Sequence, residues 1–258
     1  MNVQRTKNLD LALHAYPDMF FEHVGLQLDP WHREFLGQRA RNNLLLCGRQ
    51  IGKSTTTSGV CVHEAEYYAP ILILLTSPSE RQSKEILRKV NEIYHLFMGE
   101  DNQILEREST LQLETKRGSR IVALPGNEAT VRGFSKVGLL VIDEASRVPD
   151  QFYYTARPML ATSGGRMIAL TTPFGKRGWF YDQWTKDNDF LKIKYTSEQC
   201  ARIPPEFLRQ EREDIPDFWY QQEYLCEFLD PVDSLFTHEQ IQAAMSYDVA
   251  PLFEGEII

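Results

Sequence analysis

The chain alternates between short apolar runs and longer stretches with helical periodicity. The largely apolar runs occupy residues 43–47, 71–76, 138–142 and 166–171. The stretches with helical spacing are 53–68, 80–98, 150–161 and 178–187. Because strands that are apolar on both faces are typical of buried parallel sheets, we predict an α/β fold with a mostly parallel sheet covered by helices on both faces.

Three further segments add to this plan. Residues 8–24 predict one amphipathic helix, and a second helix is expected to begin at Asp29, as its N-cap, and Pro30. Residues 103–124 predict a hairpin of two short strands that turns at residues 116–118.

The last part of the chain differs in character. No further buried strand is expected after the run at 166–171, and residues 204–228 are helical, charged and aromatic. We therefore predict a core at 1–196, followed by a small helical lid subdomain and the start of a linker at 197–258.

Composition and charge narrow the class of protein. The 258 residues are 42% hydrophobic and 25% charged, and no apolar run approaches the roughly 18 residues of a membrane span, so no membrane contact is expected. The four cysteines lack C-x-x-C spacing, which favours reduced thiols in the cytoplasm over zinc or disulfides. A net charge of −8 argues against a broadly basic surface, so any contact with DNA must be focal or shared among subunits.

The first apolar run leads into a glycine loop, C-G-R-Q-I-G-K-S, at residues 47–54. In such loops backbone N–H groups and the following helix N-terminus surround phosphates. Lys53 would place its charge at the β- and γ-phosphates, and the Ser54 hydroxyl could ligate Mg²⁺. The loop departs from the usual pattern at Cys47, where that pattern has glycine. The predicted nucleotide contacts in this segment are Gly48, Arg49, Gln50, Ile51, Gly52, Lys53, Ser54 and Thr55.

A second apolar strand ends in two adjacent carboxylates, Asp143 and Glu144. Asp143 is predicted to hold the same magnesium ion, and Glu144 to orient and deprotonate the attacking water. The chemistry indicated is hydrolysis of a nucleoside triphosphate, with ATP and Mg²⁺ as the expected ligands. A strand–turn–helix with a solvated lysine would leave the paired carboxylates unexplained.

Two arginines are candidates for the cation that stabilises phosphoryl transfer. Arg49 lies inside the loop, where a guanidinium suits phosphate geometry. Arg132 lies in A-T-V-R-G-F-S, just before the carboxylate strand. Such an arginine can act on its own site or on that of a neighbouring subunit, and the sequence leaves open which of the two is the finger.

Two residue pairs flank the expected site. Thr171 and Thr172 end a strand at the sheet edge where ligands of parallel sheets bind, and a hydroxyl there can sense the γ-phosphate. A strand end terminated by Pro173 is the structural alternative. Trp31 and His32 precede the loop and could hold an adenine; a core tryptophan beside a capping histidine is the alternative.

Six basic residues are candidate contacts with DNA phosphates. Three share one helix face at i, i+3 and i+7, and three crowd a hairpin tip. They are Arg81, Lys84 and Arg88 on the helix, and Lys116, Arg117 and Arg120 at the tip. For any one of them a solvated charged face is the simpler interpretation. His63, Glu64 and Glu66 show no metal-site spacing and are expected at the surface.

Taken together, these segments resemble the ATPase domain of the large terminase subunit of tailed bacteriophages. The resemblance runs from about residue 28 to 236 and rests on the order of its motifs. They are P-W-H-R-E-F-L, C-G-R-Q-I-G-K-S, T-S-P-S-E-R-Q-S, L-L-V-I-D-E-A, L-T-T-P-F-G-K-R-G-W-F and F-W-Y-Q-Q-E-Y-L-C-E-F. Each motif alone is weak, whereas their combination is specific.

The resemblance implies a RecA-like P-loop ATPase that drives double-stranded DNA into a procapsid. It implies a homo-oligomeric ring, contacts with a portal protein and a small terminase subunit, and a location in the host cytoplasm at the procapsid portal. It makes Glu144 the catalytic base and Thr171–Thr172 a coupling motif. Arg132 matches the trans-acting arginine of some members, and Arg49 matches the one proposed in others. His32 stands where the family usually has glutamine.

Two other functions fit part of the pattern. The segment I-D-E-A also resembles the first RecA-like domain of a DExx-type helicase, although the order of the T-T-P strand and the lid counts against it. A non-hydrolysing, nucleotide-dependent DNA-binding scaffold is the second alternative. Full-length large terminases continue into a nuclease domain; because the sequence stops at Ile258 before any such strand, no nuclease activity is expected.

Overall fold

A central sheet organises the molecule. The computed structural model describes residues 6–99, 105–230, 240, 243 and 244, and within them eight strands form one sheet in the order β3-β4-β5-β2-β6-β7-β1-β8. The strands are β1 (Asn42–Cys47), β2 (Leu72–Ser77), β3 (Leu105–Ser109), β4 (Gln112–Thr115), β5 (Arg120–Pro125), β6 (Leu139–Asp143), β7 (Arg166–Thr171) and β8 (Leu191–Tyr195). The run from β5 to β8 is parallel, and only β3–β4 and β4–β5 pair antiparallel.

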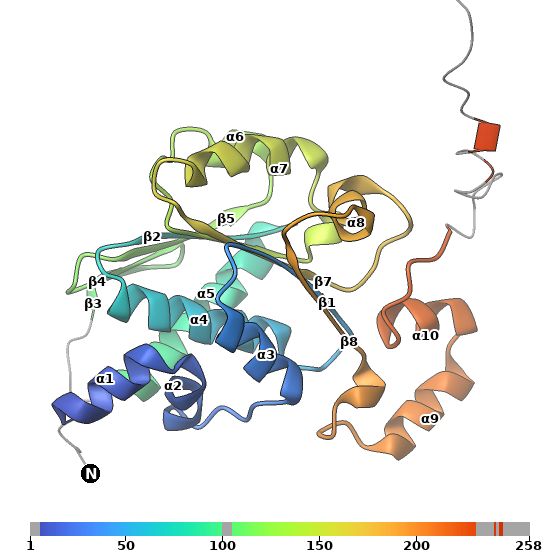
Figure 1. Ribbon diagram of the computed structural model, residues 1–258, viewed down its shortest axis with the longest axis horizontal. Helices are drawn as coiled ribbons and strands as arrows, with labels where there is room; N and C mark the ends of the chain where they lie inside the picture. The colour runs from blue at the N-terminus through green and yellow to red at the C-terminus, as the bar shows by residue number, and fades with distance from the viewer. Residues whose placement is uncertain (1–5, 100–104, 231–239, 241–242, 245–258) are drawn as a thin grey trace, which may run out of the picture.

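Helices cover both faces of this sheet (Figure 1). One face carries α1 (Lys7–Ala15), α2 (Pro17–His23), α3 (Pro30–Gln38), α4 (Lys53–Tyr67) and α5 (Glu80–Met98). The other carries α6 (Glu128–Val131), α7 (Asp150–Ala156) and α8 (Gly178–Thr185), with the 3-10 turns η1 (Ala145–Arg147) and η2 (Arg157–Leu160) nearby. The predicted α/β fold with a mostly parallel, doubly covered sheet is confirmed.

The sheet separates two hydrophobic cores, one on each of its faces. Alternate strand residues point to opposite faces, so each strand must be apolar throughout when both faces are covered. The first core contains Leu45, Leu75 and Val141 under α4 and α5. The second contains Leu44, Leu74 and Leu140 under α7 and α8.

The predicted helix over residues 8–24 is two helices. Pro17 has no backbone N–H with which to continue α1, and its ring restricts the preceding Tyr16 to extended conformations. Tyr16 has φ −123° and ψ 90°, and Pro17 then opens α2 at the first helical position. The expected helix at Pro30, with Asp29 as its N-cap, is present.

β8 is a strand that the sequence prediction missed. Residues 191–195 read L-K-I-K-Y, with Ile193 and Tyr195 buried and Lys194 exposed. This alternation marks an edge strand with one covered side, and it is the signal that could have identified β8. β8 pairs in parallel with β1 and places Tyr195 opposite Cys47, at the start of the glycine loop.

The helices after β8 lie beyond this edge of the sheet (Figure 1). They are η3 (Ser197–Gln199), α9 (Pro205–Asp214) and α10 (Asp217–Glu223). Most of the predicted lid and linker beyond residue 230 falls outside the described residues, and the division at residue 196 stays a prediction. In the described parts of the chain, no helix combines the length and apolar character needed to cross a membrane.

The predicted surface position of His63, Glu64 and Glu66 is wrong. All three are buried, because α4 packs on the sheet beside α5 and is covered by α2, which leaves it little solvent-facing side. Glu64 is compensated by ion pairs with Arg39 and Arg166, as a buried carboxylate must be.

His63 makes the fold sensitive to acid. Burial lowers the pKa of His63 to about 4, and its Nε2 lies 3.0 Å from the Leu13 carbonyl oxygen. The unfolded chain takes up a proton near pH ~6.5, so this stability is complete above that pH and is lost as the pH falls toward the folded-state pKa. We expect His63 to lower the free energy of unfolding by about 2 kcal/mol between pH 7.5 and 5.

The variant His63→Phe isolates this contribution. It removes the titrating group and keeps a ring beside Phe20 and Tyr67, which both contact His63. Urea unfolding at both pH values should show a smaller pH dependence in the variant, whatever its absolute stability at pH 7.5. An unchanged pH dependence would contradict the assignment.

Candidate active site

The candidate residues meet at the carboxyl-terminal edge of the parallel strands. The glycine loop follows β1, Asp143 ends β6, and Thr171 ends β7, which lies between those two strands. The register places Leu46 opposite Thr171 and Leu170 opposite Asp143. Residues far apart in the sequence therefore share one edge, where ligands of open α/β sheets bind.

Ser54 and Asp143 form an oxygen-donor pair. The Ser54 hydroxyl donates to Asp143 Oδ2 at 3.2 Å, and the backbone N–H of Glu144 donates to Asp143 Oδ1 at 3.0 Å. Burial raises the pKa of Asp143, while the charge of Lys53 and these hydrogen bonds oppose the rise. A hydroxyl and a carboxylate at this separation fit a magnesium ion, which prefers oxygen ligands.

A cleft of about 520 Å³ opens above the glycine loop, which is a volume typical of small-molecule sites. Seven of the eight predicted loop contacts, Arg49 to Thr55, line it. The Lys53 ammonium donates to the carbonyl oxygens of Cys47 (3.0 Å) and Gly48 (2.8 Å), so it lies over the loop.

Glu144 lines the same cleft in an uncommon backbone conformation. Its φ of 49° and ψ of 43° are left-handed, a region that non-glycine residues enter rarely and that recurs at functional sites. Burial raises the pKa of Glu144, against the opposing charge of Lys53. A carboxylate of raised basicity that faces the phosphate loop suits the general-base role predicted for it.

The two threonines connect β7 to the segment after Glu144. Thr171 is fully buried, and its Oγ1 lies 2.7 Å from the Ser146 hydroxyl oxygen. That hydroxyl also donates to the Thr172 carbonyl at 2.9 Å, and Thr172 lines the cleft. Thr172 therefore faces the cleft, whereas Thr171 contacts the segment after Glu144 through its hydrogen bond with Ser146.

The two candidate arginines occupy different environments. Arg49 lines the cleft of its own chain, and its Nε donates to Glu223 Oε2 at 2.8 Å. Arg132 has 69% of its side chain exposed and pairs with Glu128 on the short helix α6. Arg132 is not among the residues that line the cleft.

Residues 197–223, which begin the predicted lid, are hydrogen-bonded to the glycine loop. The Arg49 backbone N–H donates to the Glu223 carbonyl at 2.9 Å, and the Ser197 hydroxyl donates to the Arg49 carbonyl at 2.8 Å. A Cβ on Gly48 would lie 2.4 Å from Ser197 Oγ and 2.6 Å from Ser197 N, so this position requires glycine because the lid backbone packs on it. Ser197 and Glu223 therefore hold the glycine loop against the segment that follows β8.

Trp31 lies in the hydrophobic core, whereas His32 lines a second chamber. Trp31 is buried in the first core and stacks on His32 with ring centroids 3.9 Å apart. His32 lines a chamber of about 240 Å³ that also touches Gly52 and Thr55. Trp31 reaches that chamber only through His32.

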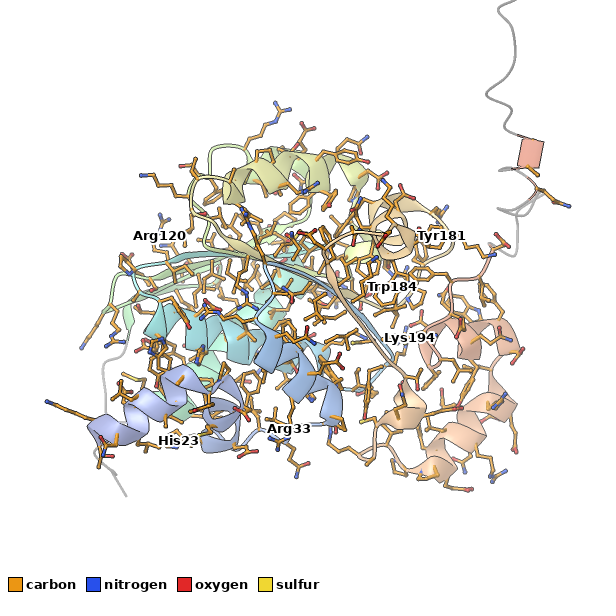
Figure 2. The ribbon with its side chains drawn as sticks, viewed as in Figure 1. His23, Arg33, Arg120, Tyr181, Trp184 and Lys194 are labelled. Atoms are coloured by element: carbon orange, nitrogen blue, oxygen red, sulfur yellow. The ribbon has the colours of Figure 1, made fainter. Side chains whose placement is uncertain are left out.

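The six candidate DNA contacts do not form one surface. Arg120 begins β5 and pairs with Leu72 at the start of β2, so the hairpin tip lies at the edge of the sheet opposite the glycine loop. Figure 2 shows Arg120 far from Lys194, which lies near the lid. On α5, Lys84 pairs with Glu80, and Arg88 pairs with Glu85 and Glu92, which reduces their attraction for phosphate. Their role in DNA binding stays a prediction.

Several residues near the site were missed by the sequence analysis. Gln82, Lys89 and Arg147 line the cleft, Arg202 lines the second chamber, and Glu223 contacts Arg49. Arg147 lies 3.9 Å from Glu144 and 3.8 Å from Glu223. Arg147 follows the D-E pair by three positions, and this proximity was a usable signal for it. Nothing in local spacing marks Arg202 or Glu223.

A fold that brings a Gly-Lys-Ser loop and two adjacent acids together at one sheet edge is that of a P-loop ATPase. More narrowly, the chain belongs to the family of phage large terminase subunits, as their ATPase domain. The family model described as "Terminase large subunit, T4likevirus-type, N-terminal" matches residues 44–243. The large terminase subunit of Thermus virus P23-45 is 24% identical over 270 residues, covering 90% of this chain and 55% of that protein. The chain thus spans about half the length of the curated relatives it matches.

Solved structures share the fold. The ATPase domain of the Thermus phage P74-26 large terminase has a TM-score of 0.68 at 21% identity, covering 82% of this chain and 98% of that one. The HK97 bacteriophage large terminase has a TM-score of 0.64 at 14% identity, covering 79% and 51%. A large terminase from a thermophilic bacteriophage, in complex with ADP, has a TM-score of 0.64 at 10% identity, covering 81% and 53%.

Proposed function

We propose that this chain is the motor domain that hydrolyses ATP to move double-stranded DNA into a procapsid. The observation that carries the proposal is the single cleft that holds Lys53, Ser54 and Glu144, with Asp143 hydrogen-bonded to Ser54, and whose loop is bonded to the lid. Family membership supports the movement of DNA into a procapsid as the process that ATP hydrolysis drives. The ADP complex of a structural relative supports a nucleotide as the ligand.

Six residues in or beside the cleft have proposed chemical roles. Lys53 neutralises charge on the β- and γ-phosphates, and Ser54 and Asp143 would hold Mg²⁺, which would withdraw charge from the phosphate oxygens. Glu144 orients water and accepts its proton as the γ-phosphoryl group departs. Thr172 meets the γ-phosphate side of the cleft, and Thr171 passes the change to Ser146.

We assign the two arginines to different subunits. Arg49 acts within its own site, where it already lines the cleft and contacts the lid. Arg132 acts on the adjacent subunit, because its side chain is exposed and outside its own cleft. An arginine that acts on the adjacent subunit requires a ring of several copies of the chain. The portal protein and the small terminase subunit are the proposed partners of this ring in the host cytoplasm. The lid proposed at 197–258 transmits hydrolysis to subunit motion.

A packaging assay tests this function. With procapsids, ATP and Mg²⁺, the assembled motor should protect duplex DNA from added nuclease, and DNA should stimulate ATP turnover. Lys53→Ala should abolish both effects, because the variant loses the charge that the phosphates require. Separation of the two DNA strands without protection would favour the helicase alternative, and binding of DNA without turnover would favour the scaffold.

A further inference from the structure

The helix α5 brings two side chains to the phosphate cleft. Gln82 and Lys89 both line the cleft, and they share one face of the helix because they lie seven positions apart. α5 follows β2, on one side of the strands β6, β7 and β1, whereas Glu223 lies in the segment that follows β8, on the other side. The two side chains therefore reach the cleft from the β2 side of the sheet.

Packing against the sheet and α4 holds α5 in this position. Its buried face includes Ile86 and Val90, and the Ile86 carbonyl oxygen lies 3.4 Å from the Ser58 hydroxyl oxygen on α4. Side chains on a helix lean toward the N-terminus of that helix. Because α5 begins just after β2 ends, Lys89 leans toward the strand ends and the cleft.

Lys89 differs from the neighbouring cations of α5. Lys84 pairs with Glu80, and Arg88 pairs with Glu85. Among the described residues, the Lys89 ammonium has neither a hydrogen-bond acceptor nor an ion-pair partner, although its side chain is half-buried. Its charge is therefore available to a ligand of the cleft.

Gln82 offers a second donor from the same helix face. Its Oε1 accepts the hydroxyl proton of Ser79 at 2.8 Å, and its N–H₂ group has no acceptor within the described ranges. An ammonium can only donate, and the amide of Gln82 keeps its donor side for a ligand. The part of the cleft that α5 lines therefore suits an anion.

In the part of the chain that the structure describes, one cation of the cleft is not matched by an acid. The cations that line the cleft and the carboxylates in or beside it are Arg49, Lys53, Lys89 and Arg147, and Asp143, Glu144 and Glu223. Arg49 and Arg147 contact carboxylates, and Lys53 donates to two loop carbonyls. A triphosphate is still negative after it binds Mg²⁺, and Lys89 can meet it without giving up a contact within the protein.

The position of α5 points to the terminal phosphate, and this step rests on the proposed function. Loops of this kind surround the α- and β-phosphates, so the γ-phosphate lies beyond Lys53, on the side of Asp143 and Glu144. β6, which ends in Asp143, pairs with β2, which leads into α5. Burial raises the pKa of Asp143, and the charges of Lys53 and Lys89 oppose that rise, so Lys89 acts on the carboxylate beside the γ-phosphate.

We propose that Lys89 binds the γ-phosphate of ATP within its own chain and thereby makes the site prefer ATP over ADP. A hydrogen bond to a charged group contributes roughly 10- to 150-fold to affinity, and ADP lacks the phosphate that would receive this one. The contact does not need Arg132, which is exposed and outside the cleft of its own chain. A single chain can thus distinguish ATP from ADP before a neighbouring subunit completes the site.

Calorimetry on the dilute chain tests the proposal, with a non-hydrolysable ATP analogue and ADP as the two ligands and with Mg²⁺ present. Lys89→Met keeps an unbranched apolar stem and removes the charge. It should weaken binding of the ATP analogue by roughly 10- to 150-fold and change ADP binding by less than about threefold. Equal weakening of both ligands, or no change in either, would overturn the proposal.

Two further variants separate the charge of Lys89 from its packing. Lys89→Arg keeps a cation and should keep the ratio of the two dissociation constants near the wild-type value; a ratio like that of Lys89→Met would contradict a role for the charge. Lys7→Met makes the same substitution at an exposed lysine of α1 and should leave both constants unchanged. Because both ligands are measured in one protein, a partial loss of folded protein does not alter their ratio. Failure of the wild-type chain to bind either ligand would instead contradict the proposed function.

Discussion

Replacing Glu144 with glutamine is expected to lower the rate of ATP turnover by roughly 10²- to 10⁴-fold while nucleotide binding persists. Glutamine has nearly the same shape but cannot accept a proton from water. Glu144 lines the cleft with Lys53, so the loss should fall on the chemical step and not on the affinity. The left-handed backbone at Glu144 tolerates glutamine, since Gln50 adopts a similar conformation in the same chain.

The measurement pairs steady-state ATP turnover of the assembled motor with equilibrium binding of ATP and Mg²⁺. Glu213→Gln is the matched control, because Glu213 is exposed on α9 and, among the described residues, its ion-pair partner is the neighbouring Arg209. It should leave both quantities unchanged. If Glu144→Gln turns over ATP within about threefold of the wild-type rate, another group must be the base.

Replacing Arg132 with alanine is expected to lower ATP turnover of the assembled ring by about 10³- to 10⁵-fold, the range attributed to arginine fingers. The side chain is exposed and absent from the cleft of its own chain. A diluted, monomeric chain should therefore already be a poor ATPase, and Arg132→Ala should change it little.

Mixed rings distinguish action on a neighbour from action on the same chain. Arg132→Ala keeps Glu144, and Glu144→Gln keeps Arg132, so rings made from both contain sites with every group only if Arg132 acts across the interface. Mixing the two inactive proteins should restore part of the turnover. Lys136→Ala, an exposed cation of the same loop, is the control and should not lower the rate. No recovery in mixed rings would assign Arg132 to its own site or to structure.

Contiguous patterns in the sequence predicted the parallel sheet and the two main parts of the candidate site, which are the glycine loop and the pair of acids. Four central strands are apolar on both faces, and the loop at 47–54 and the Asp143–Glu144 pair each lie within a few consecutive residues. Because such patterns reflect local backbone geometry and burial, they can be recognised without knowledge of the rest of the fold. Short, right-handed connections between parallel strands then allow only a few strand orders in which the two acids and the glycine loop lie at the same edge of the sheet.

Contacts between distant segments were decided by the tertiary structure alone. The pairs Arg49–Glu223 and Arg202–Asp29 join residues more than 170 positions apart, and no local periodicity relates them. Burial of His63 and Glu64 depends on the second layer of helices packed over α4, and β8 is a five-residue edge strand whose partner is β1. The sequence by itself thus determined the fold class and the strand ends that carry the candidate site residues. Packing decided how residues 197–223, the chamber beside His32 and Arg132 are placed around them, because those positions depend on which surfaces the completed sheet leaves available.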